Sequence, residues 1–581
     1  MRLAELKEIN IKILIVRGFK KFAELLSSPI LLWTLVGVTT LLTYLRIYFG
    51  TDVSDEAYYV ACALLTAIGG KPYTNDMYFQ QNASLLYEPI VFIYNRIIGT
   101  TGVILFVRHL YFILAMGCST SFYCLFRRLI KSDQAAIVSL LPITFIFGVL
   151  PSLSYNTISS LCFGMGMALT INGLLSKKFY LQAWGSVSLA LATFAYPSFG
   201  FGAFLFLLTG LAWSWRTDKA IFKSLFISAI ICAFVFGGLW TLTLSRFGYQ
   251  NLLDSIQLTR DFGAMGNPMT KLHQAFDIFR LYCPPTWCLG LILVGIFGIS
   301  LFALNWLWAM PLIGLSFLLT SPVSPEALPS HVFLSMICLL GLPSILLGRR
   351  NWDRNFIVSF SIVVPSVLMA FLVGWTSANT AYTTALTSQF AVIAILFLGV
   401  AKAPRSLTFL AMVFLHGPLL FWNYKHVYRD NPIGELTMMM QSGPYAGLLT
   451  TAERKQVLTE VESDINEMKK KANSILFYDY FPAGYLFSNL RPATRSVYIH
   501  QLPYGLPARH MYTQFYQDPK NRPDVFFQFE SFPIFTNTYV YFRPEMTKSP
   551  EDDFYDMLSN TGDYKLIQQR KHYKVWLKKT L

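Results

Sequence analysis

Long apolar runs separated by short polar connections fill the first two thirds of the chain. A membrane-spanning helix needs about twenty apolar residues, and thirteen stretches approach that length, with a count open by two either way. They lie near 30–49, 101–125, 135–150, 157–175, 182–197, 199–215, 224–244, 286–303, 305–320, 331–347, 355–374, 381–400 and 406–422. The pattern predicts a polytopic α-helical membrane protein with about 13 transmembrane helices.

Alternate connections between these runs carry the lysines and arginines. The cationic connections contain Arg127, Arg128 and Lys131; Lys177 and Lys178; Arg216, Lys219 and Lys223; Arg349, Arg350 and Arg354; and Lys402 and Arg405. The positive-inside rule makes these loops cytoplasmic. The basic, amphipathic segment 1–29 agrees with them, so we expect a cytoplasmic N-terminus. An odd number of spans then places the C-terminus outside the cytoplasm.

The composition changes to that of a soluble fold after residue 422. One face of a predicted helix at 449–471 is apolar. Strand-like runs follow at 475–480, 497–502, 525–530, 538–543 and 573–578, with Pro and Gly between them. We therefore expect a membrane domain over 30–422 and a small soluble α/β domain over 423–581.

Two outer loops of the membrane domain are too long to be mere connectors. They span 50–100 and 245–285, and long loops in compact domains are usually functional. The first contains two amphipathic stretches, 55–69 and 89–99, which we expect to lie in the membrane interface.

Composition supports a bilayer partner. The chain is 54% hydrophobic and 14% charged, with a mean hydropathy of +0.45. Its formal net charge of +15 is distributed in short clusters between apolar runs, where cations set membrane orientation. Nucleic acid is therefore not an expected partner.

Carboxylates gather just after the first predicted span. The sequence Thr51-Asp52-Val53-Ser54-Asp55-Glu56 places an acidic pair at the membrane edge. Two readings are open. Ser54 could cap a helix whose first turn carries acidic residues that complement its dipole, or the carboxylates could do chemistry. Further along, Glu88 precedes Pro89, which suits the first position of a helix, so Glu88 could also serve as a cap.

The order of these pieces resembles the membrane-embedded GT-C glycosyltransferases, among them the aminoarabinose and protein mannosyl transferases. The shared pattern covers roughly 45–130: an acidic pair after span one, an interfacial helix, Gly-Gly-Lys-Pro-Tyr at 69–73, Tyr-Glu-Pro at 87–89, and Arg108 in the second span. The resemblance implies that Asp55 is the catalytic carboxylate, with Glu56 as its neighbour and Glu88 as the loop glutamate. The chain departs from the aminoarabinose pattern because Pro89 and Ile90 replace the lysine and two prolines expected after that glutamate.

The resemblance further implies a polyprenyl-phosphate-linked sugar as donor and a glycan, glycolipid or protein as acceptor. It implies an integral protein of a bacterial inner (plasma) membrane with an extracytoplasmic C-terminal domain. Expelling a phosphate requires cations but little general-acid help, so a single carboxylate base can suffice, whereas a glycosidase would need two.

Candidate ligands for the donor phosphate are the cations of the outer loops: Arg246, Arg260, Lys271, Arg280 and Lys71. Each could equally be an interfacial residue extending towards lipid headgroups. Candidate substrate-binding residues are Tyr58, Tyr73, Tyr87 and His331, although a lone histidine at a helix entrance is more often structural. Metal dependence is open, with Asp55 and Glu88 as the candidate ligands of a divalent ion.

The alternative function is that of a transporter or flippase of a lipid-linked or small polar substrate. Ion-coupled carriers usually place ionisable residues at mid-membrane depth and often consist of two related halves. Here the apolar runs are almost free of charge and the long outer loops carry the charged groups. This distribution favours chemistry at the membrane surface.

Overall fold

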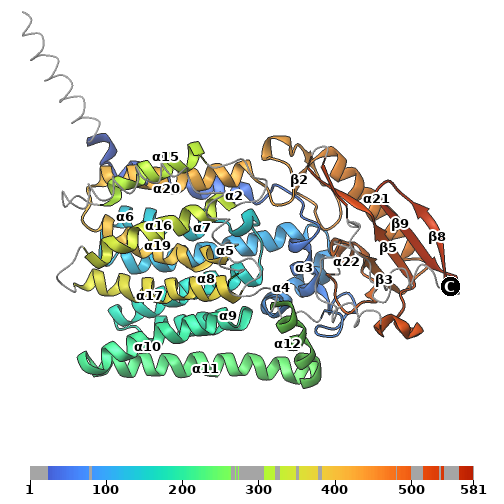
Figure 1. Ribbon diagram of the computed structural model, residues 1–581, viewed down its shortest axis with the longest axis horizontal. Helices are drawn as coiled ribbons and strands as arrows, with labels where there is room; N and C mark the ends of the chain where they lie inside the picture. Colours follow the sequence, from blue (N-terminus) through green and yellow to red (C-terminus); the bar gives the residue numbers. More distant parts are fainter. Residues whose placement is uncertain are drawn as a thin grey trace, which may run out of the picture.

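The computed structural model consists of a helical bundle joined at one end to a mixed α/β domain (Figure 1). It describes residues 24–76, 81–263, 269, 273, 306–320, 328–347, 353–376, 383–478, 481–498, 514–535, 538–541 and 562–579. The predicted span 286–303, the N-terminal residues 1–23, and residues 264–268, 270–272 and 274–285 of the second outer loop lie outside the described residues.

Apolar helices run side by side through the bundle. They are α2 (Pro29–Arg46), α5 (Val103–Phe126), α8 (Tyr155–Ser176), α9 (Phe179–Ala195), α10 (Phe199–Thr217), α11 (Lys219–Phe247), α15 (Met310–Thr320), α16 (Leu328–Leu347), α17 (Arg354–Thr376), α19 (Ala385–Val400) and α20 (Arg405–Lys425). Within the described ranges, six helices are long and apolar enough to cross a membrane, and four shorter apolar helices of 10–17 residues accompany them. A polytopic helical architecture is thus present, and the count of thirteen stays a prediction.

The predicted span at 135–150 is wrong as a continuous helix. The chain there forms α6 (Ser132–Val138), α7 (Leu141–Thr144) and the short 3-10 helix η2 (Phe147–Val149). Pro142 lies in the first turn of α7, where the missing backbone N–H of proline costs no helical hydrogen bond. Gly148 and Val149 then adopt positive φ angles of 63° and 51°, which end any helical course.

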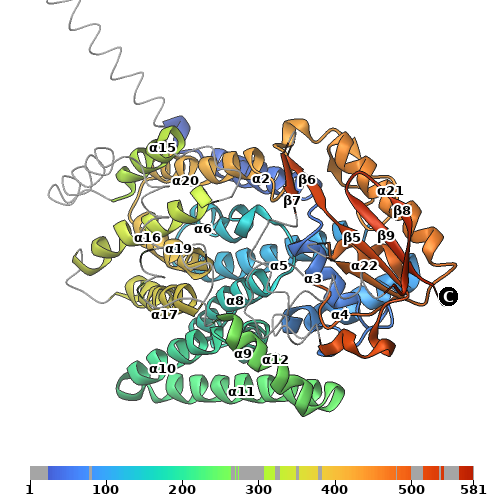
Figure 2. The same ribbon diagram turned by 45° about the vertical axis from the view of Figure 1, so that its right-hand side comes forward.

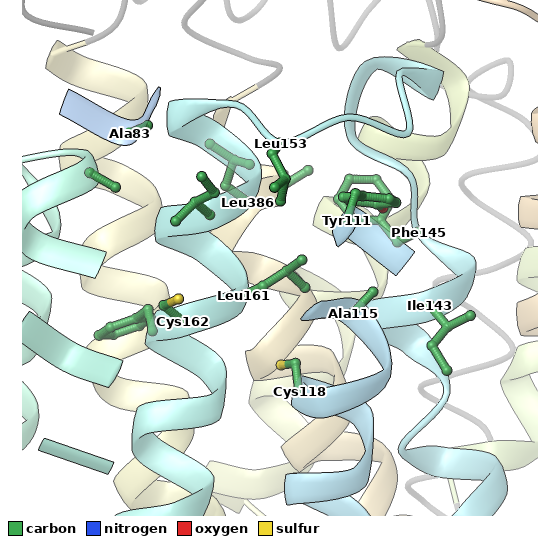
Figure 3. Close-up of a cluster of buried hydrophobic side chains, with 14 of the residues drawn as sticks. Ala83, Tyr111, Ala115, Cys118, Ile143, Phe145, Leu153, Leu161, Cys162 and Leu386 are labelled. Atoms are coloured by element: carbon green, nitrogen blue, oxygen red, sulfur yellow. The ribbon is translucent and has the colours of Figure 1, made fainter. Parts of the chain in front are cut away.

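The core of the bundle is built from small and branched side chains of α5 and α8, packed on α19 and on the loops around η2. Figure 3 shows part of it, with Cys118 of α5, Cys162 of α8 and Leu386 of α19 pointing into one cluster. Close packing of this kind is what membrane helices rely on, since lipid offers no hydrophobic driving force between them.

The C-terminal domain carries a five-stranded mixed sheet in the order β4-β3-β5-β9-β8. Its strands are β3 (Ser474–Tyr478), β4 (Arg491–Pro492), β5 (Val525–Phe529), β8 (Tyr564–Gln569) and β9 (Tyr573–Lys578). Strand β3 is parallel to β4 and β5, and β9 is antiparallel to β5 and β8. The helix α21 (Ala452–Met468) packs beside this sheet, and two hairpins, β1 (Met438–Met439) with β2 (Leu449–Thr450) and β6 (Ser531–Phe535) with β7 (Thr538–Tyr541), complete the domain.

The first outer loop forms α3 (Asp55–Leu64) and α4 (Asn82–Ile98), which lie between the bundle and the sheet (Figures 1 and 2). Helix α3 does not lie open in the membrane interface as predicted, because α22 (Ala483–Ser488) covers it and eight of its ten residues are buried. Helix α4 begins before Pro89, which therefore lies inside the helix and not at its first position. The outer face of α4 exposes Ile90, Ile93 and Ile97, as an interfacial helix would.

Candidate active site

Asp55 is the first residue of helix α3, and the buried carboxylate of Asp52 accepts hydrogen bonds at the N-terminal end of this helix. Asp52 Oδ2 accepts the Glu56 backbone N–H at 2.7 Å, and its Oδ1 accepts the Ser54 backbone N–H at 3.1 Å and the Ser54 hydroxyl at 2.5 Å. The Ser54 side chain makes no capping bond, so Asp52 caps the helix in place of the predicted Ser54. Burial raises the pKa of Asp52 to about 6.

This arrangement releases Asp55 from capping and leaves it half-buried, with 23% of its side chain exposed. Two tyrosine hydroxyls donate to its two oxygens: Tyr428 to Oδ2 and Tyr498 to Oδ1. Tyr428 follows the last helix of the bundle, and Tyr498 belongs to the C-terminal domain. Three segments far apart in the sequence therefore meet at one carboxylate.

Arg429 is the cation beside Asp55. Its Nη2 lies 3.6 Å from Asp55 Oδ2, and its Nη1 donates to the Ser54 hydroxyl. The backbone at Arg429 has a φ of 48°, a conformation uncommon for residues other than glycine and often found at functional sites. Sequence reasoning missed this arginine because it follows a span end, where a cation is usually interfacial.

The backbone around Arg429 is firmly held. Arg454 Nη2 donates to the Arg429 carbonyl at 2.6 Å, and Arg454 Nη1 pairs with Asp430 at 3.1 Å. Asp430 also accepts the Thr51 backbone N–H at 2.8 Å. These buried contacts tie the segment after α20 to the start of the first outer loop, and so they fix Arg429 relative to Asp55.

Tyrosines surround the Asp55 carboxylate. Tyr59 contacts Tyr155 at a ring distance of 6.0 Å, and Tyr155 contacts Tyr196 at 5.2 Å. Burial raises the pKa values of Tyr59 and Tyr428, and the charge of Asp55 adds to both shifts. These phenols therefore stay protonated and can act only as neutral donors or acceptors near the carboxylate.

Glu56, the predicted neighbour of the catalytic carboxylate, is fully buried and points to Arg108. The Arg108 guanidinium binds both oxygens of Glu56, at 2.8 and 2.6 Å. It also donates to the backbone carbonyls of Ile47, Phe49 and Gly50 at 2.7–3.0 Å. The pair thus joins α3 to α5 and to the end of α2.

Glu88 lies away from Asp55. Arg246 binds both of its oxygens at 2.6–2.7 Å, and the Thr66 hydroxyl donates at 2.5 Å. Thr66 follows the C-terminal end of α3, whereas Asp55 begins it, and a helix of ten residues is about 15 Å long. The structure therefore separates Glu88 and Arg246 from the Asp55 carboxylate.

The remaining predicted site residues fall into three groups. Tyr58, Tyr73, Tyr87 and His331 are buried and hydrogen-bonded, with Asp76, Asn82, the carbonyls of Tyr59 and Leu153, and the Gly148 N–H as partners. Lys71 is exposed. The side chain of Arg260 in α12 (Tyr249–Gly263), and Lys271 and Arg280 entirely, lie outside the described residues. Asp55 is thus partly exposed within a polar cluster, and Arg246 is partly exposed in a separate cluster with Glu88 and Thr66.

The residues around Asp55 do not fit a divalent metal site. Both oxygens of Asp52 accept protein N–H or O–H donors, and a guanidinium lies beside Asp55. Across the described part of the chain, no three His, Cys, Asp or Glu side chains come close enough together to hold an ion. The two candidate ligands are apart: Asp55 begins α3, whereas Glu88 of α4 binds Thr66, which follows the other end of α3.

No family model and no curated protein sequence matches the chain. Its fold is similar to that of the Archaeoglobus fulgidus oligosaccharyltransferase in complex with Zn and sulfate, at 11% identity and a TM-score of 0.45, over 85% of this chain and 67% of that one. The A. fulgidus oligosaccharyltransferase AglB with an inhibitory peptide and a dolichol-phosphate gives 12% and 0.45, over 85% and 69%. ArnT from Cupriavidus metallidurans bound to undecaprenyl phosphate gives 11% and 0.38, over 94% and 97%.

Proposed function

We propose that this protein transfers a sugar from a polyprenyl-phosphate-linked donor to a hydroxyl acceptor on the extracytoplasmic face of the membrane, with Asp55 as the general base. The observation that carries the proposal is the position of Asp55: a partly exposed carboxylate at the end of a helical bundle, beside a partly exposed arginine. Glycan, glycolipid and protein hydroxyls are all within the acceptor class.

The geometry supports a base that accepts one proton. Tyr428 and Tyr498 donate to the two Asp55 oxygens, and the Arg429 guanidinium lies 3.6 Å from Oδ2; donors and a cation of this kind favour the ionised form of a carboxylate, which is the form that accepts a proton. As the acceptor oxygen attacks the anomeric carbon, its proton passes to Asp55 and the phosphate leaves with the electron pair of the glycosidic bond. Arg429 supplies positive charge next to the reacting groups.

The end of the bundle at which Asp55 lies supports the extracytoplasmic assignment. Helix α5 starts beside the hairpin of β1 and β2 in the C-terminal domain, where the Gly102 N–H donates to the Gly443 carbonyl at 2.9 Å. It ends at Phe126, next to the cationic Arg127 and Arg128. The positive-inside rule assigns that far end to the cytoplasm, so Asp55 and the C-terminal domain belong outside.

Charge placement favours this proposal over a transporter. Arg46 is the last residue of α2, and Arg108 lies near the start of α5 beside the same end of the bundle. Asp133 lies at the opposite end, paired with Arg405 at 2.5 Å. In the described helices these buried charges thus occupy the bundle ends and fasten elements together, unlike the mid-membrane ionisable groups of ion-coupled carriers.

The test is Asp55→Asn in the full-length protein reconstituted into nanodiscs, with radiolabelled undecaprenyl-phosphate hexoses as donor probes and extracted cell-envelope glycolipids and glycans as acceptors. Asparagine keeps the shape but cannot take the proton, and a general base contributes about a hundred- to ten-thousand-fold in rate. We expect transfer to fall at least a hundredfold while donor binding is retained.

Asp218→Asn is the matched control. Asp218 caps α11 and accepts the Ala220 N–H at 2.8 Å, so this variant changes an exposed helix-capping aspartate far from the site. It is expected to keep full transfer. Retention of more than about a third of the activity in Asp55→Asn would show that Asp55 is structural and would overturn the proposal.

A further inference from the structure

Asp76 connects the Asp55 helix to the C-terminal domain. Its Oδ2 accepts the Tyr58 hydroxyl at 2.9 Å and the Cys62 thiol at 3.3 Å, both from α3. Its Oδ1 accepts the Ser496 hydroxyl at 2.9 Å. The carboxylate is completely buried, and a buried carboxylate is tolerated only where its oxygens are hydrogen-bonded.

Ser496 belongs to a strap, residues 491–498, that runs from β4 towards the site. Asn75, next to Asp76, donates from Nδ2 to the carbonyls of Pro492 and Thr494 at 3.1 and 3.0 Å. The Ser496 oxygen in turn accepts the Tyr498 backbone N–H at 3.0 Å. Asn75 and Asp76 of the first outer loop therefore hydrogen-bond to the strap at Pro492, Thr494 and Ser496, immediately before Tyr498.

The Tyr498 ring is positioned by the same network. It lies against the ring of Tyr58 with a centroid distance of 4.9 Å, and the Tyr58 hydroxyl is the one bound to Asp76. With its backbone held by Ser496 and its ring by Tyr58, Tyr498 directs its hydroxyl at Asp55 Oδ1. Preorganised donors of this kind need no rearrangement during the reaction.

We propose that the C-terminal domain supplies Tyr498 as a hydrogen-bond donor that orients the general base and keeps it ionised, and that Asp76, through Ser496 and Tyr58, is the residue that positions Tyr498. This rests on the proposed function. Besides Tyr498, the charged and titratable groups among the described residues that face Asp55 are Arg429 and Tyr428 after α20, Asp52 and Tyr59 of the first outer loop, and Tyr155 of α8, and all of them are unchanged in the variants below. A hydrogen bond donated to a carboxylate favours its charged form. Loss of the Tyr498 hydroxyl therefore raises the pKa of the base and lowers the fraction ready to accept a proton at mildly acidic pH.

The experiment measures kcat against pH for transfer from undecaprenyl-phosphate hexose in three variants: Tyr498→Phe, Ser496→Ala and the double variant. Tyr498→Phe should lower kcat about tenfold and move the acidic limb of the profile up by about one pH unit. Ser496→Ala should also lower kcat and move the acidic limb to higher pH, but by smaller amounts. The double variant should behave like Tyr498→Phe alone, because Ser496 acts through Tyr498.

Tyr94→Phe is the control, since the Tyr94 hydroxyl binds the Thr101 carbonyl at 2.6 Å and does not touch Asp55. It should leave the profile unchanged. Asp76→Asn should lower kcat and raise the acidic limb like Ser496→Ala, and if it fails to fold the Ser496 variant carries the test.

An unmoved acidic limb in Tyr498→Phe, or effects of Ser496→Ala and Tyr498→Phe that simply add, would overturn the inference. The Asp55→Asn variant, assayed in parallel, separates the two failures. If Asp55→Asn abolishes transfer but Tyr498→Phe changes nothing, only the positioning role is wrong. If Asp55→Asn retains transfer, the proposed base is wrong.

Discussion

Breaking the Glu56–Arg108 pair should cost stability, not chemistry. Both side chains are almost completely buried, and removing one partner of a buried ion pair typically costs about 3–5 kcal/mol because an uncompensated charge remains. Arg108→Met also removes the donor to the Ile47 and Gly50 carbonyls, at about 1 kcal/mol each. Its total, roughly 5–7 kcal/mol on these figures, approaches the entire stability of many domains.

Glu56→Gln should be milder, at about 3 kcal/mol, because Arg108 keeps its carbonyl partners. In the double variant no buried charge remains, so its destabilisation should be at least about 2 kcal/mol smaller than the sum of the single effects. Thermal unfolding midpoints of the purified proteins in nanodiscs, measured at one fixed scan rate, should rank the variants by their loss of stability.

Glu467→Gln is the control for this series. Glu467 pairs with Lys471 across one exposed helical turn, and such pairs contribute about 0.3–0.5 kcal/mol. The reasoning is refuted if Glu56→Gln unfolds like the parent yet loses transfer a hundredfold, because Glu56 would then be a catalytic group. Strict additivity in the double variant would contradict the ion-pair account.

Three more predictions follow from single sites. Burial raises the pKa of Asp52 from 3.8 to about 6. The protonated side chain therefore stabilises the folded state below pH 4, and this contribution of about 3 kcal/mol is lost as the pH rises to 6. Thermal unfolding midpoints measured from pH 4 to 7 should fall accordingly, and Asp52→Asn should make them less dependent on pH. Gly50 has a φ of 91°, and an added Cβ would lie 2.3 Å from Val427 Cγ1, so Gly50→Ala should destabilise by about 2 kcal/mol or more, with a lower unfolding midpoint than Gly434→Ala as the check. Arg246→Gln should leave the KM for the donor within about twofold of the parent value, because Arg246 pairs with Glu88 beyond the far end of α3. A rise of about tenfold, as expected for the loss of a charge-assisted phosphate contact, would show that Arg246 binds the donor phosphate.

Sequence pattern predicted the parts of this molecule that depend on local order. Hydrophobic runs gave most of the apolar helices, and α21, β3, β5 and β9 lie where periodicity placed them. The broken segment after Lys131 was missed because its apolar composition matches a span, while Pro142 and the backbone at Gly148 interrupt it. Helix α3 was misplaced because an amphipathic pattern cannot distinguish a lipid surface from a covering protein domain.

The candidate site was predictable only for the side chain that a local motif carries. Asp55 stands in an acidic cluster after a span, which is a visible signal. Arg429 and Tyr498 have no such motif, and they reach Asp55 only because Arg454, Asp430 and the strap bring distant segments together. Tertiary contacts between residues hundreds of positions apart leave no periodic trace in one sequence.

Two buried arginines explain how the site stays in place at the end of a bundle. Arg46 donates to the carbonyls of Asn423 at 2.6 Å and Val149 at 3.0 Å, and it shares the Phe49 carbonyl with Arg108. Together they fasten the ends of α2, α5 and α20 to one another through backbone atoms. Asp55 follows the end of α2 and Arg429 follows the end of α20, so the proposed base and the cation beside it are both held close to this buried joint. Catalytic groups need positions fixed to within about half an ångström, and the joint provides such support for the proposed site.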